Sequence, residues 1–260
     1  MDLGIKGRSA LVCASSQGLG LACAEALARE GVAVTLNGRR ADTLAAAADA
    51  LRHRVPGATV DCIAADLTTA DGRETIVRAK PEIDILVNNN AGPAPGALDQ
   101  WDESALLGAL NANMIPAVQL MRHYIPGMRA RRFGRIVNIT SAMVKSPHYI
   151  MGLSTSARTA LTAISKAISV EVVVDNVTIN NLLPERIDTP RQDFMAQRLM
   201  SEHGIDRDEA RRRIASTINA KRLGRPDEFG AACAFLCGVQ ASYISGQNLQ
   251  LDGGSYEGLV

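Results

Sequence analysis

The chain has 260 residues, of which 47% are apolar and 21% charged, a composition that suits one folded domain and excludes general disorder. With 28 Lys and Arg against 27 Asp and Glu, the formal charge is +1, so neither nucleic acid nor an anionic membrane surface is an expected partner. The five cysteines are odd in number and none stand in C-x-x-C spacing, which favours a reducing cytoplasm, and we expect no metal site.

The N-terminal residues carry Asp2, Lys6 and Arg8 before a short apolar run. That run is shorter than the apolar core of a signal peptide or a membrane span. We therefore expect neither export nor membrane insertion.

Short runs of β-forming residues alternate with longer amphipathic stretches along the chain. The first half predicts strands at 9–13, 33–36, 59–64 and 83–87 and helices at 18–30, 41–52, 72–79 and 103–131. The second half predicts strands at 135–139, 178–183 and 248–251 and helices at 154–174, 192–215 and 227–237. Nearly continuous apolar strands with crossover helices are typical of a parallel sheet buried on both faces. We expect an α/β, doubly wound fold over 1–260, with a parallel seven-stranded sheet between two helical layers.

A glycine-rich turn joins the first predicted strand to the first helix. It contains Ala14, Ser16, Gln17, Gly18, Leu19 and Gly20. Such a turn lets backbone N–H groups and the positive end of a helix approach a pyrophosphate, because Cβ atoms do not block the contact. Taken alone, it is explained equally well as a tight strand-to-helix connection.

Two arginines, Arg39 and Arg40, follow the second predicted strand, where dinucleotide-binding folds recognise the adenosine ribose. An acidic residue there would accept from a free 2′-hydroxyl, whereas an arginine complements a 2′-phosphate. The pair favours NADP(H) over NAD(H). The alternative is two solvated arginines at the start of a helix.

The fourth predicted strand ends in Asn88-Asn89-Asn90-Ala91-Gly92, which places polar amides and then bare backbone at the carboxyl edge of the sheet. Ligands bind at that edge in open α/β folds. In isolation, the segment also fits an Asn-rich turn.

These segments occur together with Asp66-Leu67, Ile139-Thr140-Ser141, Pro184 with Thr189, and Asp252-Gly253-Gly254. In this order they resemble the short-chain dehydrogenase/reductase family over essentially the whole chain, and within it the 3-oxoacyl-acyl-carrier-protein reductases. The resemblance implies a Rossmann fold, a dimer or tetramer, and a substrate that is a small molecule or a thioester. It implies that Asp66 contacts adenine, that Asn90 and Gly92 line the cofactor channel and that Thr189 bonds the nicotinamide carboxamide. The cofactor residues that it implies beside them are Leu67, Ala91, Pro184 and Ile187.

The catalytic positions of the family are altered. The family uses Ser, Tyr and Lys plus a helix Asn; Ser141 occupies the serine position, and the asparagine falls on Asn113 or Asn111. The tyrosine and lysine fall on Ser154 and Arg158. A serine hydroxyl is far less acidic than a tyrosine, so Ser154 cannot readily donate the proton. Arg158 can still hold ribose hydroxyls and place positive charge beneath the nicotinamide.

The segment between Ser141 and Ser154 carries two groups that could replace the missing tyrosine. Histidine titrates near neutral pH and tyrosine is a chemically suitable donor, so we hypothesise that His148 or Tyr149 supplies the proton. The alternative is that both shape the pocket or face solvent.

The phosphate turn is altered as well. Cys13 and Ala14 stand where Thr and Gly are usual, and Glu185 follows Pro184 where Gly is usual. The methyl group of Ala14 fits the turn if the backbone there does not require a positive φ.

The first functional hypothesis is an NADP(H)-dependent reductase of a carbonyl compound such as a 3-oxoacyl thioester, with residues 190–216 as a substrate lid. The second is a dinucleotide-binding protein without redox turnover, acting as a sensor or oligomeric partner. The third is a lyase or isomerase that uses the same pocket.

Overall fold

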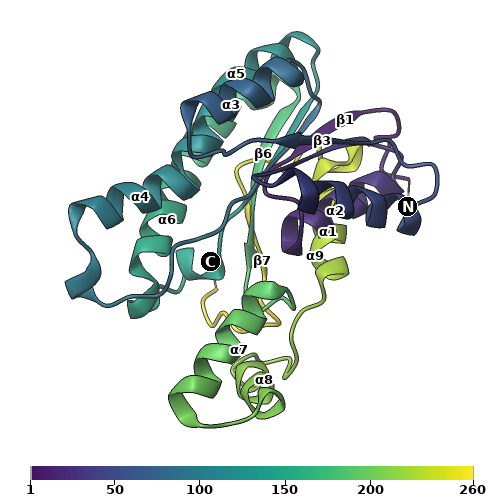
Figure 1. Cartoon of the computed structure of the whole chain (residues 1–260). Coiled ribbons are helices and arrows are strands. Elements are labelled where there is room, and N and C mark those ends of the chain that lie inside the picture. Colours follow the sequence, from purple (N-terminus) through teal and green to yellow (C-terminus); the bar gives the residue numbers. More distant parts are fainter. Residues whose placement is uncertain (1, 260) are drawn as a thin grey trace.

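The computed structural model describes residues 2–259, and its elements follow the predicted order from the first strand to the last (Figure 1). Within these residues the strands are β1 (Ser9–Val12), β2 (Ala33–Gly38), β3 (Val60–Ala64), β4 (Ile85–Asn88), β5 (Gly134–Ile139), β6 (Val177–Pro184) and β7 (Asn248–Leu251). They form a parallel seven-stranded sheet in the order β3-β2-β1-β4-β5-β6-β7. The predicted α/β fold is confirmed.

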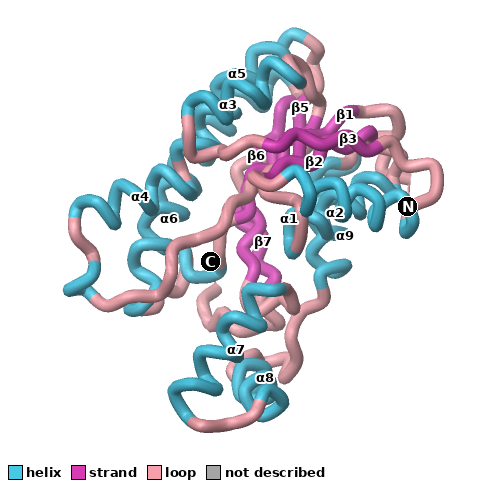
Figure 2. The backbone as a smooth tube through the Cα atoms, viewed as in Figure 1, coloured by secondary structure: helices cyan, strands magenta, loops and turns pink. Residues whose placement is uncertain are grey.

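Helices cover both faces of this sheet (Figure 2). In the described chain they are α1 (Gly18–Arg29), α2 (Ala41–Arg54), α3 (Ala70–Ala79), α4 (Glu103–Asn113), α5 (Ile115–Ala130), α6 (Gly152–Val172), α7 (Pro190–His203), α8 (Arg207–Ser216) and α9 (Pro226–Cys237). Side chains of β1 alternate between the two faces. Ala10 and Val12 join a core with α1, α2 and α9, whereas Leu11 packs with α3, α5 and α6.

Two predicted helices are each broken in two. The stretch 103–131 is interrupted at Met114, just before Pro116, because a proline has no N–H to donate to the preceding turn. The stretch 192–215 is interrupted at Gly204, whose φ of 64° ends α7 in the left-handed conformation. A new cap then starts α8, where the Asp206 carboxylate accepts from the Glu209 N–H at 2.8 Å.

The stretch Glu103–Ala130 has the length and hydropathy that a membrane span requires. Its second part, α5, buries Leu120, Met121 and Met128 in the core beneath the sheet. Of the most apolar window of this stretch, 33% is buried.

The order of the strands reverses beside β1. The chain runs outward through β2 and β3, then returns so that β4 pairs with the other side of β1. The connections leaving the carboxyl ends of β1 and β4 therefore diverge, and ligands of open α/β sheets bind in the crevice that this creates.

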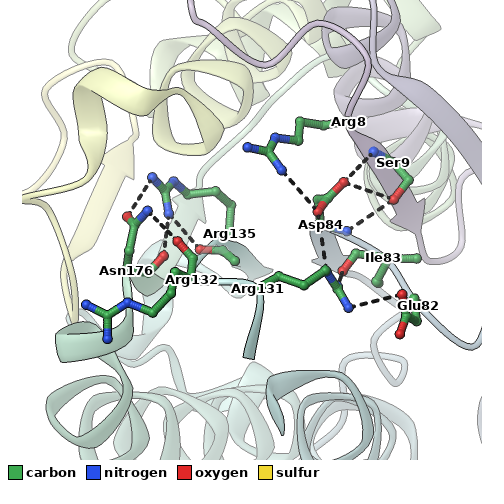
Figure 3. A network of polar contacts seen from close by, with 10 residues as sticks. Arg8, Ser9, Glu82, Ile83, Asp84, Arg131, Arg132, Arg135 and Asn176 are labelled. Atoms are coloured by element: carbon green, nitrogen blue, oxygen red, sulfur yellow. Dashed lines mark hydrogen bonds and ion pairs between the residues drawn. The ribbon is translucent and has the colours of Figure 1, made fainter. Parts of the chain in front are cut away.

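At the amino ends of the strands, away from this crevice, a polar network joins neighbouring strands (Figure 3). The Asp84 carboxylate accepts from the backbone N–H of Ser9 at 3.0 Å and pairs with Arg8. The buried Arg135 guanidinium donates to the Asn176 carbonyl at 2.9 Å. These contacts join β1, the start of β4 and β5 away from the carboxyl edge, so this network stabilises the fold rather than the site.

The helices α7 and α8 pack on one another and project beyond β7 (Figure 1). They carry a small apolar cluster of their own, centred on Ala196, Ala210 and Ile214. This pair is the segment that the sequence predicts as the lid.

Candidate active site

A cleft of about 560 Å³ opens at the carboxyl ends of the central strands. The predicted site residues that line it are Ala14, Ser16, Gln17, Gly18, Leu19, Arg39, Asp66, Leu67, Asn90, Ala91, Gly92, Ser141, His148, Ser154, Arg158, Pro184, Ile187 and Thr189. They come from the turns after β1, β2, β3, β4, β5 and β6 and from the start of α6. The topology thus brings together residues that lie up to 175 positions apart in the chain, from Ala14 to Thr189.

The turn after β1 is tightly packed against its neighbours. A Cβ on Gly20 would lie 2.5 Å from the Ala14 carbonyl oxygen, so only glycine allows α1 to approach the turn this closely. The Asn89 side-chain amide donates to the same oxygen at 3.2 Å. Gly20 supports the shape of the turn without lining the cleft.

The backbone at Ala14 does have the positive φ that the methyl group of alanine disfavours. Its φ is 45°, in the left-handed region that disfavours residues with a Cβ. The methyl group is accommodated with backbone strain, and the turn has the conformation for which glycine is the unstrained residue.

The two arginines after β2 have different surroundings. Arg39 is exposed and lines the cleft. Arg40 does not line it, and its guanidinium instead makes a bidentate contact with Asp42, at 3.1 Å from Nε and 2.7 Å from Nη2. The placement supports Arg39 alone as a phosphate ligand.

Asp66 lies at the same end of the cleft. Its carboxylate accepts from the Thr68 backbone N–H at 2.9 Å and from the Thr68 hydroxyl at 2.8 Å. These hydrogen bonds hold the pKa of Asp66 below its ordinary value, so the group is an ionised acceptor at neutral pH.

At the other end of the cleft, Arg158 is held by four neutral acceptors. Its Nη1 donates to the carbonyls of Ile139 at 2.8 Å and Thr140 at 3.0 Å, its Nη2 to the Asn90 carbonyl at 3.3 Å, and its Nε to the Ser154 hydroxyl at 3.2 Å. Burial, and then the charge of Arg191, lower the pKa of Arg158 to about 10. The guanidinium is therefore still charged at neutral pH, in a place where its charge is poorly screened.

Ser141 and Ser154 line the cleft beside this charge. The Ser141 oxygen accepts from the Met143 N–H at 3.2 Å, which orients the side chain. A Cβ on Gly92 would lie 3.1 Å from the Ser154 oxygen and 3.3 Å from Arg158 Nη2, so Gly92 lets this strand end pass close to both groups.

Asn113 lies behind Arg158 rather than in the main cleft. It lines a second cavity of about 20 Å³ with Arg158 and Asn88, which has room for one water molecule. Its amide donates to the Ala91 carbonyl at 3.2 Å, and its Oδ1 is buried without a partner within the described residues. The asparagine at 113 is thus the one that the fold brings next to Arg158.

The two candidate proton donors separate in space. His148 is exposed and lines the cleft. Tyr149 does not line it: its ring packs against Trp101 at 5.9 Å between centroids, and its hydroxyl accepts from the Leu98 N–H at 3.1 Å. Of the two, only His148 lines the cleft.

Further lining residues follow β6 and were not predicted as site residues: Glu185, Arg186, Arg191, Gln192 and Met195. Glu185 stands in the sequence in place of the usual glycine, and Arg191, Gln192 and Met195 lie within the predicted lid at 190–216. No motif singles out Arg186.

The whole chain matches known proteins. Residues 13–256 match the family described as Enoyl-(Acyl carrier protein) reductase. The chain is 30% identical to the NADPH-dependent reductase BacG of Bacillus subtilis over 97% of this chain and 99% of the relative. It is 28% identical to the 3-oxoacyl-[acyl-carrier-protein] reductase FabG of Vibrio harveyi over 98% and 99% of the two chains.

A solved structure is equally similar. That of L-sorbose reductase from Gluconobacter frateurii, complexed with NADPH and L-sorbose, superposes with a TM-score of 0.94 at 32% identity and covers both chains completely. Together with the cleft described above, these matches show that the chain belongs to the short-chain dehydrogenase/reductase family of oxidoreductases.

Proposed function

We propose that the protein is an NADP(H)-dependent reductase of a carbonyl compound, with a 3-oxoacyl thioester as the first substrate class to test. One observation carries the proposal: a single cleft is lined by Arg39, which is suited to pair with a 2′-phosphate, and by Ser141 with the charged Arg158. The relatives described as NADPH-dependent reductase and 3-oxoacyl-[acyl-carrier-protein] reductase support both parts.

The residues of the cleft fit the proposed cofactor. Gly18 and Gly92 offer bare backbone on its two sides, and a Cβ on Gly18 would come no closer than 3.7 Å to Thr189. Arg39 would pair with the 2′-phosphate, Asp66 would accept from the adenine, and Thr189 would bond the nicotinamide carboxamide. When bound, NADPH supplies the hydride.

The chain contributes orientation and charge to the carbonyl. The Ser141 oxygen already accepts a hydrogen bond from the backbone, so its own proton is available to donate to the carbonyl oxygen of a substrate. As negative charge develops on that oxygen, the fixed charge of Arg158 stabilises it in a site where few other groups reorganise. Arg158 thereby replaces the charge of the usual lysine, but Ser154 does not replace the acidity of the usual tyrosine.

The proton that completes the alcohol is assigned to His148, directly or through a water. His148→Ala is expected to lower kcat by about tenfold or more, since general acids contribute about 10²-fold or more to such steps. Tyr149→Phe is the matched control and should leave kcat within about twofold. Unchanged kcat in both variants would refute this assignment of the donor.

The proposal itself is tested by oxidation of NADPH, with NADH in parallel, by the purified protein and S-acetoacetyl-N-acetylcysteamine. Turnover that favours NADPH supports it. A protein that binds NADPH yet reduces no carbonyl compound supports the second function, a dinucleotide-binding sensor or oligomeric partner. The observation that favours this second function is that most N–H groups of Arg158 already donate to protein acceptors. We further propose that the enzyme acts in the cytoplasm as a dimer or tetramer.

A further inference from the structure

In addition to Arg39, three guanidinium groups line the cleft, those of Arg158, Arg186 and Arg191. Within residues 2–259 none of the three takes part in an ion pair. The arginines of the adjoining helix do, because Arg207 and Arg211 pair with Asp193 at 2.7 and 3.3 Å. The positive charge in the cleft is therefore not neutralised by the fold in the way that the nearby surface charge is.

The wall formed by the end of β6 and the start of α7 also carries unused hydrogen-bonding groups. The Nε of Arg186 is buried and has no partner within the described residues. Gln192 is 7% exposed, and its Oε1 is likewise buried without a partner. Because unpaired buried polar groups are costly, groups of this kind that line a cleft are suited to bind a polar ligand.

The same wall carries one carboxylate, that of Glu185, which forms no ion pair within the described residues. Glu185 is half-buried, and burial raises its pKa against the opposing effect of Arg186. Arg191 stands at the exposed rim, where partial burial of its guanidinium and the charge of Arg186 lower its pKa. Two arginines on one short segment repel each other, which an anion between them would relieve.

We propose that the substrate of this reductase carries an anionic group, held by Arg186 and Arg191, close to the carbonyl that Ser141 binds. This inference rests on the proposed function and adds the charge of the substrate to it. A guanidinium binds a carboxylate or a phosphate with paired charged hydrogen bonds, so either group fits the chemistry. The positive end of α7, which begins at Pro190, favours the same sign of charge.

Two other occupants have to be separated from a carboxylate near the carbonyl. One is the phosphate of a carrier such as coenzyme A, which would lie farther from the carbonyl. The other is the diphosphate of the cofactor. We favour the substrate over the cofactor because the turn with Gly18 at the start of α1 already offers backbone N–H groups suited to a phosphate in the same cleft.

The experiment measures binding to the NADP⁺-saturated protein by isothermal titration calorimetry, so that no turnover is needed. The probes are acetoacetate and its neutral methyl ester, followed by acetoacetyl-coenzyme A and the neutral S-acetoacetyl-N-acetylcysteamine. We expect acetoacetate to bind about tenfold or more tightly than its ester. A preference confined to the coenzyme A thioester would assign the arginines to a carrier phosphate and overturn the position next to the carbonyl.

Variants locate the preference. Arg186→Gln and Arg191→Gln should each abolish most of the preference for acetoacetate over its ester, and Arg186→Lys should keep part of it. The control is Arg198→Gln, on α7 outside the cleft, which should keep the whole preference. Equal affinity for acetoacetate and its ester, including no detectable binding of either at millimolar concentration, would overturn the inference. So would variants that weaken NADP⁺ binding and leave the preference intact.

The same probes separate this inference from the proposed function. A charge preference in binding without any oxidation of NADPH would leave the anion site standing and refute the reductase. Reduction of charged and neutral ketones with equal kcat/KM would support the reductase and refute the anion site.

Discussion

Because the backbone of Ala14 is left-handed, we predict that replacing it with glycine stabilises the fold, whereas an alanine-to-glycine change usually destabilises. At φ 45° a residue with a Cβ costs about 1–2 kcal/mol relative to glycine. Part of this is offset because glycine gains more conformational freedom in the unfolded chain, by about 0.4–1 kcal/mol. Ala14→Gly should therefore stabilise the fold by about 0.5–1 kcal/mol, which raises Tm by about 1–3 °C in a chain of this length.

The matched control is the same chemical change in a helix. Ala46 is exposed in α2, where Ala→Gly is expected to cost about 1 kcal/mol and lower Tm. Tm is measured by circular dichroism at one protein concentration without cofactor, since bound NADPH would add its own stabilisation. A decrease in Tm for Ala14→Gly as large as that for Ala46→Gly would refute the strain at this turn.

Three further predictions concern the cleft. Arg39→Gln should weaken NADPH binding about tenfold and leave NADH binding within about twofold, as measured by fluorescence titration of the two cofactors. Arg40→Gln should change the binding of both cofactors by less than about threefold, because Asp42 holds the Arg40 guanidinium. Gly20→Ala should abolish NADPH binding or lower Tm sharply, because the added Cβ would lie 2.5 Å from the Ala14 carbonyl oxygen. Gly108→Ala in α4, where a Cβ would meet nothing within 4 Å, should raise Tm, and the reverse order of the two Tm values would contradict the packing of the turn. Burial raises the pKa of Glu185 in the folded state, so its contribution to stability is present below the unfolded pKa and is lost as the pH rises through the folded pKa. The Tm of Glu185→Gln relative to that of the native chain should therefore be higher at pH 7 than at pH 4. A Tm difference that does not change with pH would contradict burial as the cause.

The sheet could be predicted from the sequence because its signals are local and repeated. Strands such as Ile136-Val137 are apolar on both faces, which a parallel sheet requires, and the helices between them share one period. The boundaries that failed lie where one residue interrupts a helical stretch, at Pro116 after Met114 and at Gly204.

The cofactor end of the cleft was also accessible to sequence reasoning, since the residues there occupy the turns after consecutive strands. The environment of each residue was not. Nothing in the pair Arg39-Arg40 reveals that Asp42 holds the second guanidinium, because that contact depends on how α2 begins. For the same reason Tyr149 and His148, adjacent in the chain, could not be assigned to opposite surroundings.

The contacts at the substrate end could not be predicted because they join residues far apart in the chain. The four acceptors of Arg158 come from the end of β5, from the turns after β4 and β5 and from α6. Arg186 affects the charge of Arg191 through the turn into α7. The charge of this end is a property of the folded chain.

The central claim is that hydride reduction occurs in a site where Ser154 and Arg158 replace the usual tyrosine and lysine. It is tested most directly by incubating the protein with NADPH deuterated at the transferred position and a 3-oxo substrate, and analysing the alcohol by mass spectrometry. The account predicts deuterium on the former carbonyl carbon with the native chain and about a tenfold or greater loss of product in Ser141→Ala. Bound NADPH that keeps its deuterium, with no alcohol formed from a thioester, an oxo acid or a ketose, would contradict it.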